Sequence, residues 1–232
     1  MLLSRPSILF NAAAFVSSFL FITGSALGFP SSGRIVFLGD SLTEQGSFPG
    51  GFIDLIQTHV TSQPDLRAVQ LSGAGVPGNT AADGLKRLDS DVLKQKPTHV
   101  VVLLGINDVW TRPDANDPKV IAEFRRTYAA IIEKIVKAGA APVICTLTVI
   151  GEKKLGQNKL DYLVDLYSQQ IREIAIKHQA RLCDLRYAFI AYLNQYNQKN
   201  LAEGLLTTDG VHLSQAGHNL VTETILTTLL SQ

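Results

Sequence analysis

The feature that most constrains the fold is a regular alternation between short apolar runs and segments with helical periodicity. Each apolar run is rich in Val, Ile or Leu and has the length of a buried strand. The segments between them repeat apolar residues every three or four positions, as amphipathic helices do. This alternation predicts a parallel sheet covered by helices on both faces. The expected strands are Arg34–Leu38, Leu66–Leu71, His99–Leu104, Pro142–Val149 and Arg181–Leu185.

The chain has 232 residues and is 46% hydrophobic, enough for one sizeable core. We expect residues 33–232 to form a single three-layer α/β domain. Its last helix should begin near Ser214, a residue type preferred at helix N-caps. The stretches Gly105–Pro118 and Gly151–Asn158 are expected to be loops at strand ends, where substrate-binding loops lie. The other helical patterns run from Phe52 to Val60, Ala81 to Val92, Val120 to Val136, Leu160 to Ile174 and Phe189 to Tyr196.

The N-terminal segment has a different character. A single charge, at Arg5, precedes the apolar run Ile8–Leu27, which ends in small residues. This pattern predicts a signal peptide over residues 1–28, cleaved after Ala26 or Gly28, and therefore export to the periplasm or the exterior. The alternative is an uncleaved membrane anchor, because the run approaches the length that spans a bilayer. No cysteine follows the segment, which argues against a lipid-attached lipoprotein.

Charge and cysteine content narrow the function classes. The formal net charge is +1 and no stretch is strongly basic, which argues against nucleic acid as a partner, since phosphate binding needs clustered Lys and Arg. The only cysteines, Cys145 and Cys183, both fall in expected strands. We expect two buried thiols rather than a disulfide, despite the oxidising destination. Two cysteines alone predict no metal site.

A serine follows the first expected strand, within Gly39-Asp40-Ser41-Leu42. That position lies at the edge of the sheet where ligands bind in open α/β folds, but a serine needs a base to become a nucleophile. Among the histidines, His212 stands in a loop just before a helix N-cap, with Asp209 three residues upstream. This spacing allows the carboxylate to reach Nδ1 while Nε2 faces the serine. Taken alone, each fragment also fits an ordinary turn.

Acyl transfer also needs hydrogen-bond donors for the developing oxyanion. Gly75-Val76-Pro77-Gly78-Asn79-Thr80 follows the second strand, and Gly78 has no Cβ to keep a ligand from its N–H. Gly105-Ile106-Asn107-Asp108 follows the third strand, and Asn107 offers a side-chain amide. The alternative for the first segment is a turn with Thr80 as a helix N-cap, and for the second a β-turn.

These segments, together and in this order, resemble the four sequence blocks of the GDSL, or SGNH, hydrolase superfamily. The blocks are Gly39-Asp40-Ser41-Leu42, Gly78, Gly105-x-Asn107-Asp108 and Asp209-x-x-His212. The resemblance extends from about Arg34 to the final helix. One departure occurs at Gly73, where the second block often has Asn. The α/β-hydrolase family is excluded, because its G-x-S-x-G pentapeptide is absent.

The resemblance implies a serine hydrolase that needs no metal or organic cofactor. Ser41 is then the nucleophile and His212 the base, with Asp209 supporting His212. The implied oxyanion donors are the backbone N–H groups of Ser41 and Gly78 and the amide of Asn107. The implied fold is flavodoxin-like, with five parallel strands in the order 2-1-3-4-5. That order places the topological switch point between strands 1 and 3, next to the same residues.

Substrate identity is less constrained by the sequence. Asp40, Asn79 and Trp110 are further candidates for contact with substrate; Trp110 either stacks on a sugar or lines an acyl cleft, or it packs its loop against the sheet. The expected substrates are short-acyl esters such as O-acetylated carbohydrates, or lysophospholipid and thioester-type acyl compounds. The alternatives are a non-catalytic carbohydrate- or lipid-binding module on the same scaffold and an O-acyltransferase that uses the same residues.

Overall fold

Five parallel strands form one sheet in the order β2-β1-β3-β4-β5. The structure is a computed structural model that describes residues 32–231, so the predicted signal peptide, residues 1–28, lies outside the described residues. The expected fold class and strand order are confirmed. The strands are β1 (Ser32–Gly39), β2 (Ala68–Gly75), β3 (His99–Leu103), β4 (Ala141–Cys145) and β5 (Arg181–Cys183).

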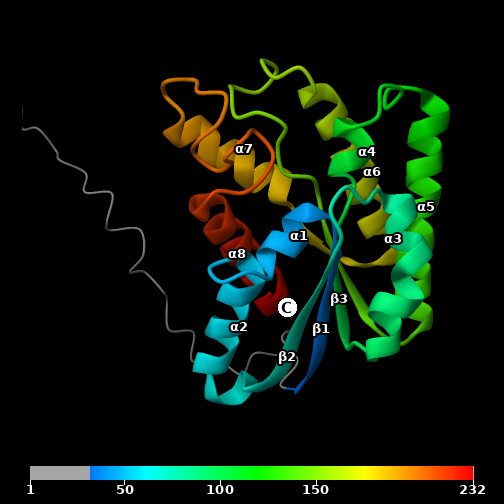
Figure 1. Ribbon diagram of the computed structural model, residues 1–232. Helices are drawn as coiled ribbons and strands as arrows, with labels where there is room; N and C mark the ends of the chain where they lie inside the picture. The colour runs from blue at the N-terminus through cyan, green and yellow to red at the C-terminus, as the bar shows by residue number, and fades with distance from the viewer. Residues whose placement is uncertain (1–31, 232) are drawn as a thin grey trace, which may run out of the picture.

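Helices cover both faces of the sheet (Figure 1). Side chains alternate between the two faces along each strand, so Ile35 and Phe37 enter one core while Val36 and Leu38 enter the other. One face carries α2 (Phe52–Ser62), α7 (Leu185–Tyr196) and α8 (Gln215–Leu230), and the other carries α3 (Ala81–Arg87), α5 (Pro118–Lys137) and α6 (Asp161–His178). Shorter helical turns are found at Pro64–Leu66, Leu88–Val92 and Leu93–Gln95.

The expected helices are present, but one residue expected on the buried face of its helix is exposed. Ser214 caps α8 through a hydrogen bond from the N–H of Gly217, as its residue type predicted. Val136 was expected on the apolar face of α5 but is 51% exposed, because its neighbour Ile135 takes the buried position. No helix within residues 32–231 is long and apolar enough to cross a membrane.

Two short helices, α1 (Ser41–Gly46) and α4 (Ile106–Trp110), follow the carboxyl ends of β1 and β3 (Figure 1). The expectation that Gly105–Pro118 is a loop was therefore wrong for its first part. A helix of barely more than one turn has no apolar periodicity by which a sequence reveals it. The stretch Gly151–Asn158 contains neither helix nor strand, as expected.

Strand boundaries also differ from the expectation. β2 begins and ends later, at Ala68 and Gly75, and Leu66 belongs to a short 3₁₀ turn. Its second half, Ser72–Gly75, has low strand propensity but pairs with β1 along its whole length. β4 ends at Cys145, although the chain stays buried up to Val149. Pairing with a neighbouring strand, rather than residue type, fixes these ends.

The two cysteines occupy neighbouring strands. Cys145 of β4 lies opposite Cys183 of β5 in the ladder, and both side chains are fully buried free thiols. The expectation of two buried thiols is confirmed. A hydrogen bond with Cys183 and burial raise the pKa of the Cys145 thiol, which keeps it protonated and unreactive.

Candidate active site

The chain turns sharply where β1 ends, and this turn presents Ser41. Asp40 caps α1, accepting a hydrogen bond on Oδ1 from the N–H of Leu42 at 3.0 Å. Ser41 is the first residue of the helix, so its own N–H has no partner within the helix. Its half-buried side chain stands at the carboxyl edge of the sheet, next to the switch point between β1 and β3.

A glycine in β2 allows α1 to lie close to the sheet. A Cβ placed on Gly75 would collide with the backbone of Glu44, in the middle of α1. Because the obstacle is backbone and not a flexible side chain, no larger residue fits without moving the helix. Gly75 thereby helps to fix the position of α1, and with it Ser41, relative to the sheet.

Ser41, His212 and Asp209 form a continuous chain of hydrogen bonds. Ser41 Oγ lies 3.1 Å from Nε2 of His212, and His212 Nδ1 lies 2.7 Å from Oδ2 of Asp209. The other carboxylate oxygen of Asp209 accepts from the N–H groups of Val211 at 3.0 Å and His212 at 2.8 Å. The loop closes at an antiparallel bridge between Thr207 and Leu213.

Hydrogen bonding also sets the charge state of the Asp209 carboxylate. Partial burial acts to raise the pKa of Asp209, but the hydrogen bonds from the His212 side chain and from the backbone outweigh it, so the pKa is lowered. A carboxylate that remains ionised holds the imidazole with its proton on Nδ1. Nε2 is then free to accept the proton of the serine.

Gly78 offers a backbone donor in the turn that follows β2. It stands at the third position of a turn closed by the hydrogen bond from Asn79 N to Val76 O at 3.2 Å, with Pro77 at the second position. The φ of Gly78 is +76°, as a type II turn requires, and only glycine adopts it without strain. Its N–H donates to no group among residues 32–231.

Asn107 lies in the first turn of α4 and is 3% exposed. Its Nδ2 donates to the carbonyl oxygen of Asn79 at 3.1 Å, which ties α4 to the turn that carries Gly78. An amide nitrogen carries two hydrogens, so one donor remains for a bound oxyanion. Asp108, the next residue, accepts from the N–H of Ala81 at 2.9 Å, and burial raises its pKa to about 6.

The three candidate substrate contacts occupy different environments. Trp110 is 42% exposed, and its ring centroid lies 5.9 Å from that of His212 in an edge-to-face arrangement. Asn79 is half-buried, with its side chain held by Arg87. Asp40 is only 1% exposed and caps α1, so its position gives no support to the expected contact with substrate. Of the three, Trp110 alone has a broad exposed surface beside the reacting groups.

Comparison with known proteins identifies the family. The sequence model of the GDSL-like lipase/acylhydrolase family matches residues 37–220, a range that contains Ser41, Gly78, Asn107, Asp209 and His212. The chain belongs to this family. The resemblance stated from the four blocks is confirmed, and membership identifies the protein as a carboxylic ester hydrolase.

Several relatives of the hydrolase share most of its length. An acetylxylan esterase from Geobacillus stearothermophilus is 26% identical over 210 residues, covering 84% of this chain and 93% of the relative. The crystal structure of the acetyl xylan esterase AlAXEase is 34% identical with a TM-score of 0.80, covering 84% of this chain and 98% of the other. The crystal structure of the acetylxylan esterase Axe2 from Geobacillus stearothermophilus, 24% identical with a TM-score of 0.76 and covering 89% and 98%, shares the fold.

Arg87 is a functional candidate that the sequence did not indicate. The last residue of α3, it donates from Nη2 to Gly39 O at 2.7 Å, from Nη1 to Ala74 O at 2.9 Å and from Nε to Asn79 Oδ1 at 2.6 Å. One guanidinium thus joins the end of β1, the end of β2 and the turn that carries Gly78. Its side chain is 14% exposed, so these charge-assisted hydrogen bonds are largely protected from water.

Glu152 also holds a segment that leads into the candidate site, and the sequence did not indicate it either. Its side chain is fully buried, and its carboxylate accepts hydrogen bonds from the N–H groups of Leu205, Leu206 and Thr207 and from the Thr207 hydroxyl. These residues lead directly into the loop of Asp209 and His212. Backbone N–H groups carry no residue identity, so no sequence pattern marks such contacts.

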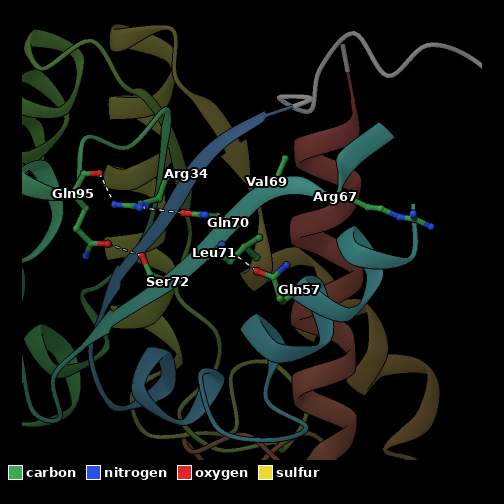
Figure 2. Close-up of a pocket in the computed structure, with 8 residues that line it drawn as sticks. All are labelled: Arg34, Gln57, Arg67, Val69, Gln70, Leu71, Ser72 and Gln95. Carbon is green, nitrogen blue, oxygen red and sulfur yellow. Dashed lines mark hydrogen bonds between the residues drawn. The ribbon is translucent and has the colours of Figure 1, made fainter. Parts of the chain in front are cut away.

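One hollow lies away from Ser41, His212 and Asp209. It has a volume of about 590 Å³ and straddles the edge strand β2 (Figure 2). Hydrogen bonds join its polar side chains to one another and to the backbone: Arg34 donates to Gln70, Ser72 donates to Gln95, and Gln57 accepts from the N–H of Leu71. It contains no nucleophile with a base beside it. Among residues 32–231 no cluster of three His, Cys, Asp or Glu side chains could hold a metal ion.

Proposed function

We propose that the hydrolase removes acetyl groups from carbohydrates through an acyl-enzyme intermediate formed on Ser41. The observation that carries this proposal is the hydrogen-bonded chain from Ser41 Oγ through His212 to Asp209. It joins a nucleophile, a base and an orienting carboxylate in the geometry that nucleophilic catalysis by serine requires.

In the first step His212 Nε2 accepts the proton of Ser41 as Oγ attacks the acyl carbonyl carbon. The carbonyl oxygen becomes an oxyanion, and the N–H groups of Ser41 and Gly78 and the amide of Asn107 donate hydrogen bonds to it. The C–O bond to the alcohol then breaks, and His212 returns its proton to the departing oxygen. Water, activated by His212 in the same way, attacks the acyl-enzyme and releases the acid.

Two observations favour acetylated carbohydrates among ester substrates. Two relatives that each match 84% of the chain are named as acetylxylan esterases. A second hollow, lined by Trp110 and Asp209, also carries the charged side chains of Lys159 and Glu203, which can form hydrogen bonds with a hydroxyl-rich alcohol. A small acyl group on a polar, hydroxyl-rich alcohol fits both observations.

A fluorophosphonate probe tests the serine mechanism, because it forms a covalent bond only with an activated nucleophile. We expect the wild-type protein to be labelled and to hydrolyse 4-nitrophenyl acetate, and Ser41→Ala to do neither. Ser62→Ala is the matched control, since Ser62 is an exposed serine at the end of α2. A wild-type protein that is neither labelled nor active on acetyl esters would refute the proposal.

A second assay tests the acyl group. Activity on 4-nitrophenyl esters should decrease from acetate to longer chains, and acetylated xylan should release acetate. A preference for acyl chains longer than about ten carbons would contradict the proposed substrate class.

We also propose that the enzyme is exported, with residues 1–28 as its signal peptide. Xylan is a polymer too large to enter a cell, so an enzyme that acts on it has to work outside. N-terminal sequencing of the protein recovered from the producing cells tests this. A mature chain that begins shortly after Ala26 or Gly28 supports export by cleavage, and an intact N-terminus in the membrane fraction supports the anchor.

A further inference from the structure

A second hollow, of about 430 Å³, lies beside the hydrogen-bonded chain of Ser41, His212 and Asp209. Three segments surround it: the end of α4, the loop from Ile150 to Lys159, and the segment from Ala202 to Val211 that carries Asp209. Its lining residues are Trp110, Ile150, Gly151, Lys153, Gln157, Asn158, Lys159, Ala202, Glu203, Asp209, Gly210 and Val211.

The walls of this hollow are joined to one another by hydrogen bonds. Gly151 N donates to Gly210 O at 2.7 Å, and Glu152 N donates to Ala202 O at 2.8 Å. Lys154 N donates to the side chain of Asn200 at 2.8 Å. Because backbone groups of the two loops are paired directly, the shape of the hollow is set by the fold before any ligand binds.

The proposed mechanism determines which part of the ester faces this hollow. The carbonyl oxygen has to point toward Gly78 and Asn107, which carry the oxyanion donors. The alcohol oxygen has to lie near Nε2 of His212, which returns the proton to it. Trp110 and Asp209 both contact His212 and both line the hollow. Neither Gly78 nor Asn107 lines the hollow, so it adjoins the His212 end of the site, from which the alcohol would depart.

The side chains that line the hollow offer both donors and acceptors. The ammonium groups of Lys153 and Lys159 and the carboxylate of Glu203 make no hydrogen bond or ion pair with any of residues 32–231, and all three residues are exposed. Trp110 adds an exposed aromatic surface. A sugar presents hydroxyl groups that both donate and accept, and C–H faces that pack on aromatic rings. An apolar alcohol could form no hydrogen bonds with these charged groups.

We infer that this hollow is the subsite that binds the sugar bearing the acetyl group, with Lys159 and Glu203 among its hydroxyl-binding residues. This inference rests on the proposed function and assigns its specificity to two loops outside the four sequence blocks. Recognition of the sugar is thus separate from the groups that carry out the chemistry.

The test compares two acetyl esters with different alcohols: O-acetylated xylotriose, which would fill the hollow, and 4-nitrophenyl acetate, which carries no sugar. In the double variant Lys159→Ala/Glu203→Ala, we expect the ratio of kcat/KM for acetylated xylotriose to kcat/KM for 4-nitrophenyl acetate to fall about tenfold, as two lost hydrogen bonds predict. Unacetylated xylotriose should inhibit hydrolysis of 4-nitrophenyl acetate competitively in wild type, with an inhibition constant raised by a similar factor in the variant.

Arg67→Ala is the matched control, because Arg67 is an exposed cation that lines the other hollow (Figure 2). It should leave the ratio and the inhibition constant unchanged. If the double variant has the same kcat/KM ratio and inhibition constant as this control while wild type hydrolyses both esters, the subsite assignment is wrong. The proposed ester hydrolase activity is then unaffected. If wild type hydrolyses neither ester and takes up no fluorophosphonate, both the proposed function and the subsite assignment are wrong.

Discussion

The guanidinium of Arg87 donates a hydrogen bond of 2.7 Å to the carbonyl oxygen of Gly39, two residues before Ser41. The same side chain holds Asn79, whose carbonyl oxygen in turn accepts from Asn107. Arg87 therefore connects the proposed nucleophile, Ser41, to both loops that carry the proposed oxyanion donors.

Replacing Arg87 by Met should lower kcat for 4-nitrophenyl acetate about 10- to 100-fold, because displacement of catalytic groups by a fraction of an ångström is costly. The inhibition constant of a boronic acid, which forms a tetrahedral adduct with an active-site serine, should rise in parallel, whereas KM should change little. Active-site titration with a fluorophosphonate corrects for unfolded protein. Arg87→Lys, which keeps the charge, should recover part of the loss; boronate inhibition equal to wild type would contradict the positioning role.

Asn107→Ala should reduce kcat about 100- to 1000-fold, because it removes a preorganised donor to the oxyanion. KM should change much less, since the ground-state carbonyl gains little from this donor. Steady-state kinetics on 4-nitrophenyl acetate measure both constants. Asn194→Ala, an exposed position of α7, is the control. An equal loss of kcat in the two variants would exclude a specific role for Asn107.

The pH profile should reveal the partnership of Asp209 and His212. Activity is expected to fall in acid, since an imidazolium cannot accept the serine proton. The lowered pKa of Asp209 means that its carboxylate stays ionised to a lower pH than an ordinary Asp. Asp209→Asn should decrease kcat about 100- to 10,000-fold and move the acidic limb of the kcat/KM profile to lower pH, because the charge that stabilises the imidazolium is gone. An unchanged acidic limb would argue against the pairing.

Glu152→Gln should destabilise the fold. The amide nitrogen cannot accept hydrogen bonds, so at least one buried N–H of the segment Leu205–Thr207 loses its partner. The expected decrease in the free energy of unfolding is about 1–3 kcal/mol, measured by urea denaturation. Glu203→Gln is the control, since Glu203 is exposed and lies two residues before that segment. Equal stability of the two variants would mean that the carboxylate of Glu152 is not needed to hold the loop.

Asp40 should make stability depend on pH. Burial raises the pKa of Asp40 to about 7 in the folded protein. The folded state therefore favours the protonated form, and stability is lost as pH rises from about 4, the usual pKa of Asp, toward 7. Asp40→Asn keeps an oxygen to cap α1 but cannot ionise. Between pH 5 and pH 8 the variant should gain on the order of 1–3 kcal/mol in unfolding free energy relative to wild type; a constant difference would show that Asp40 does not titrate in this interval.

The sequence allowed prediction of those parts of the site that have local signals. Ser41 follows a strand, Asp209 and His212 precede a helix N-cap, and Gly78 stands in a turn with Pro77; each of these depends on residues nearby in the chain. The parallel sheet was predictable for the same reason, because strand–helix alternation is a local pattern repeated along the chain.

Contacts with distant backbone groups were not predictable. Arg87 looks like any polar residue at the end of a helix, and Glu152 like any charge in a loop, because most of their partners are carbonyl and N–H groups that every residue carries. The second half of β2 is a strand because β1 pairs with it, although its own residues favour other conformations. In each case the tertiary arrangement, rather than the residue type, determines the structure.

The edge-to-face contact between Trp110 and His212 gives this enzyme a built-in optical probe. Trp110 is the only tryptophan of the chain, so all of its indole fluorescence originates next to one imidazole. A protonated imidazole quenches a neighbouring indole more strongly than a neutral one. The charge state of His212 can therefore be followed by emission intensity in the unmodified protein, without substrate and without an attached dye.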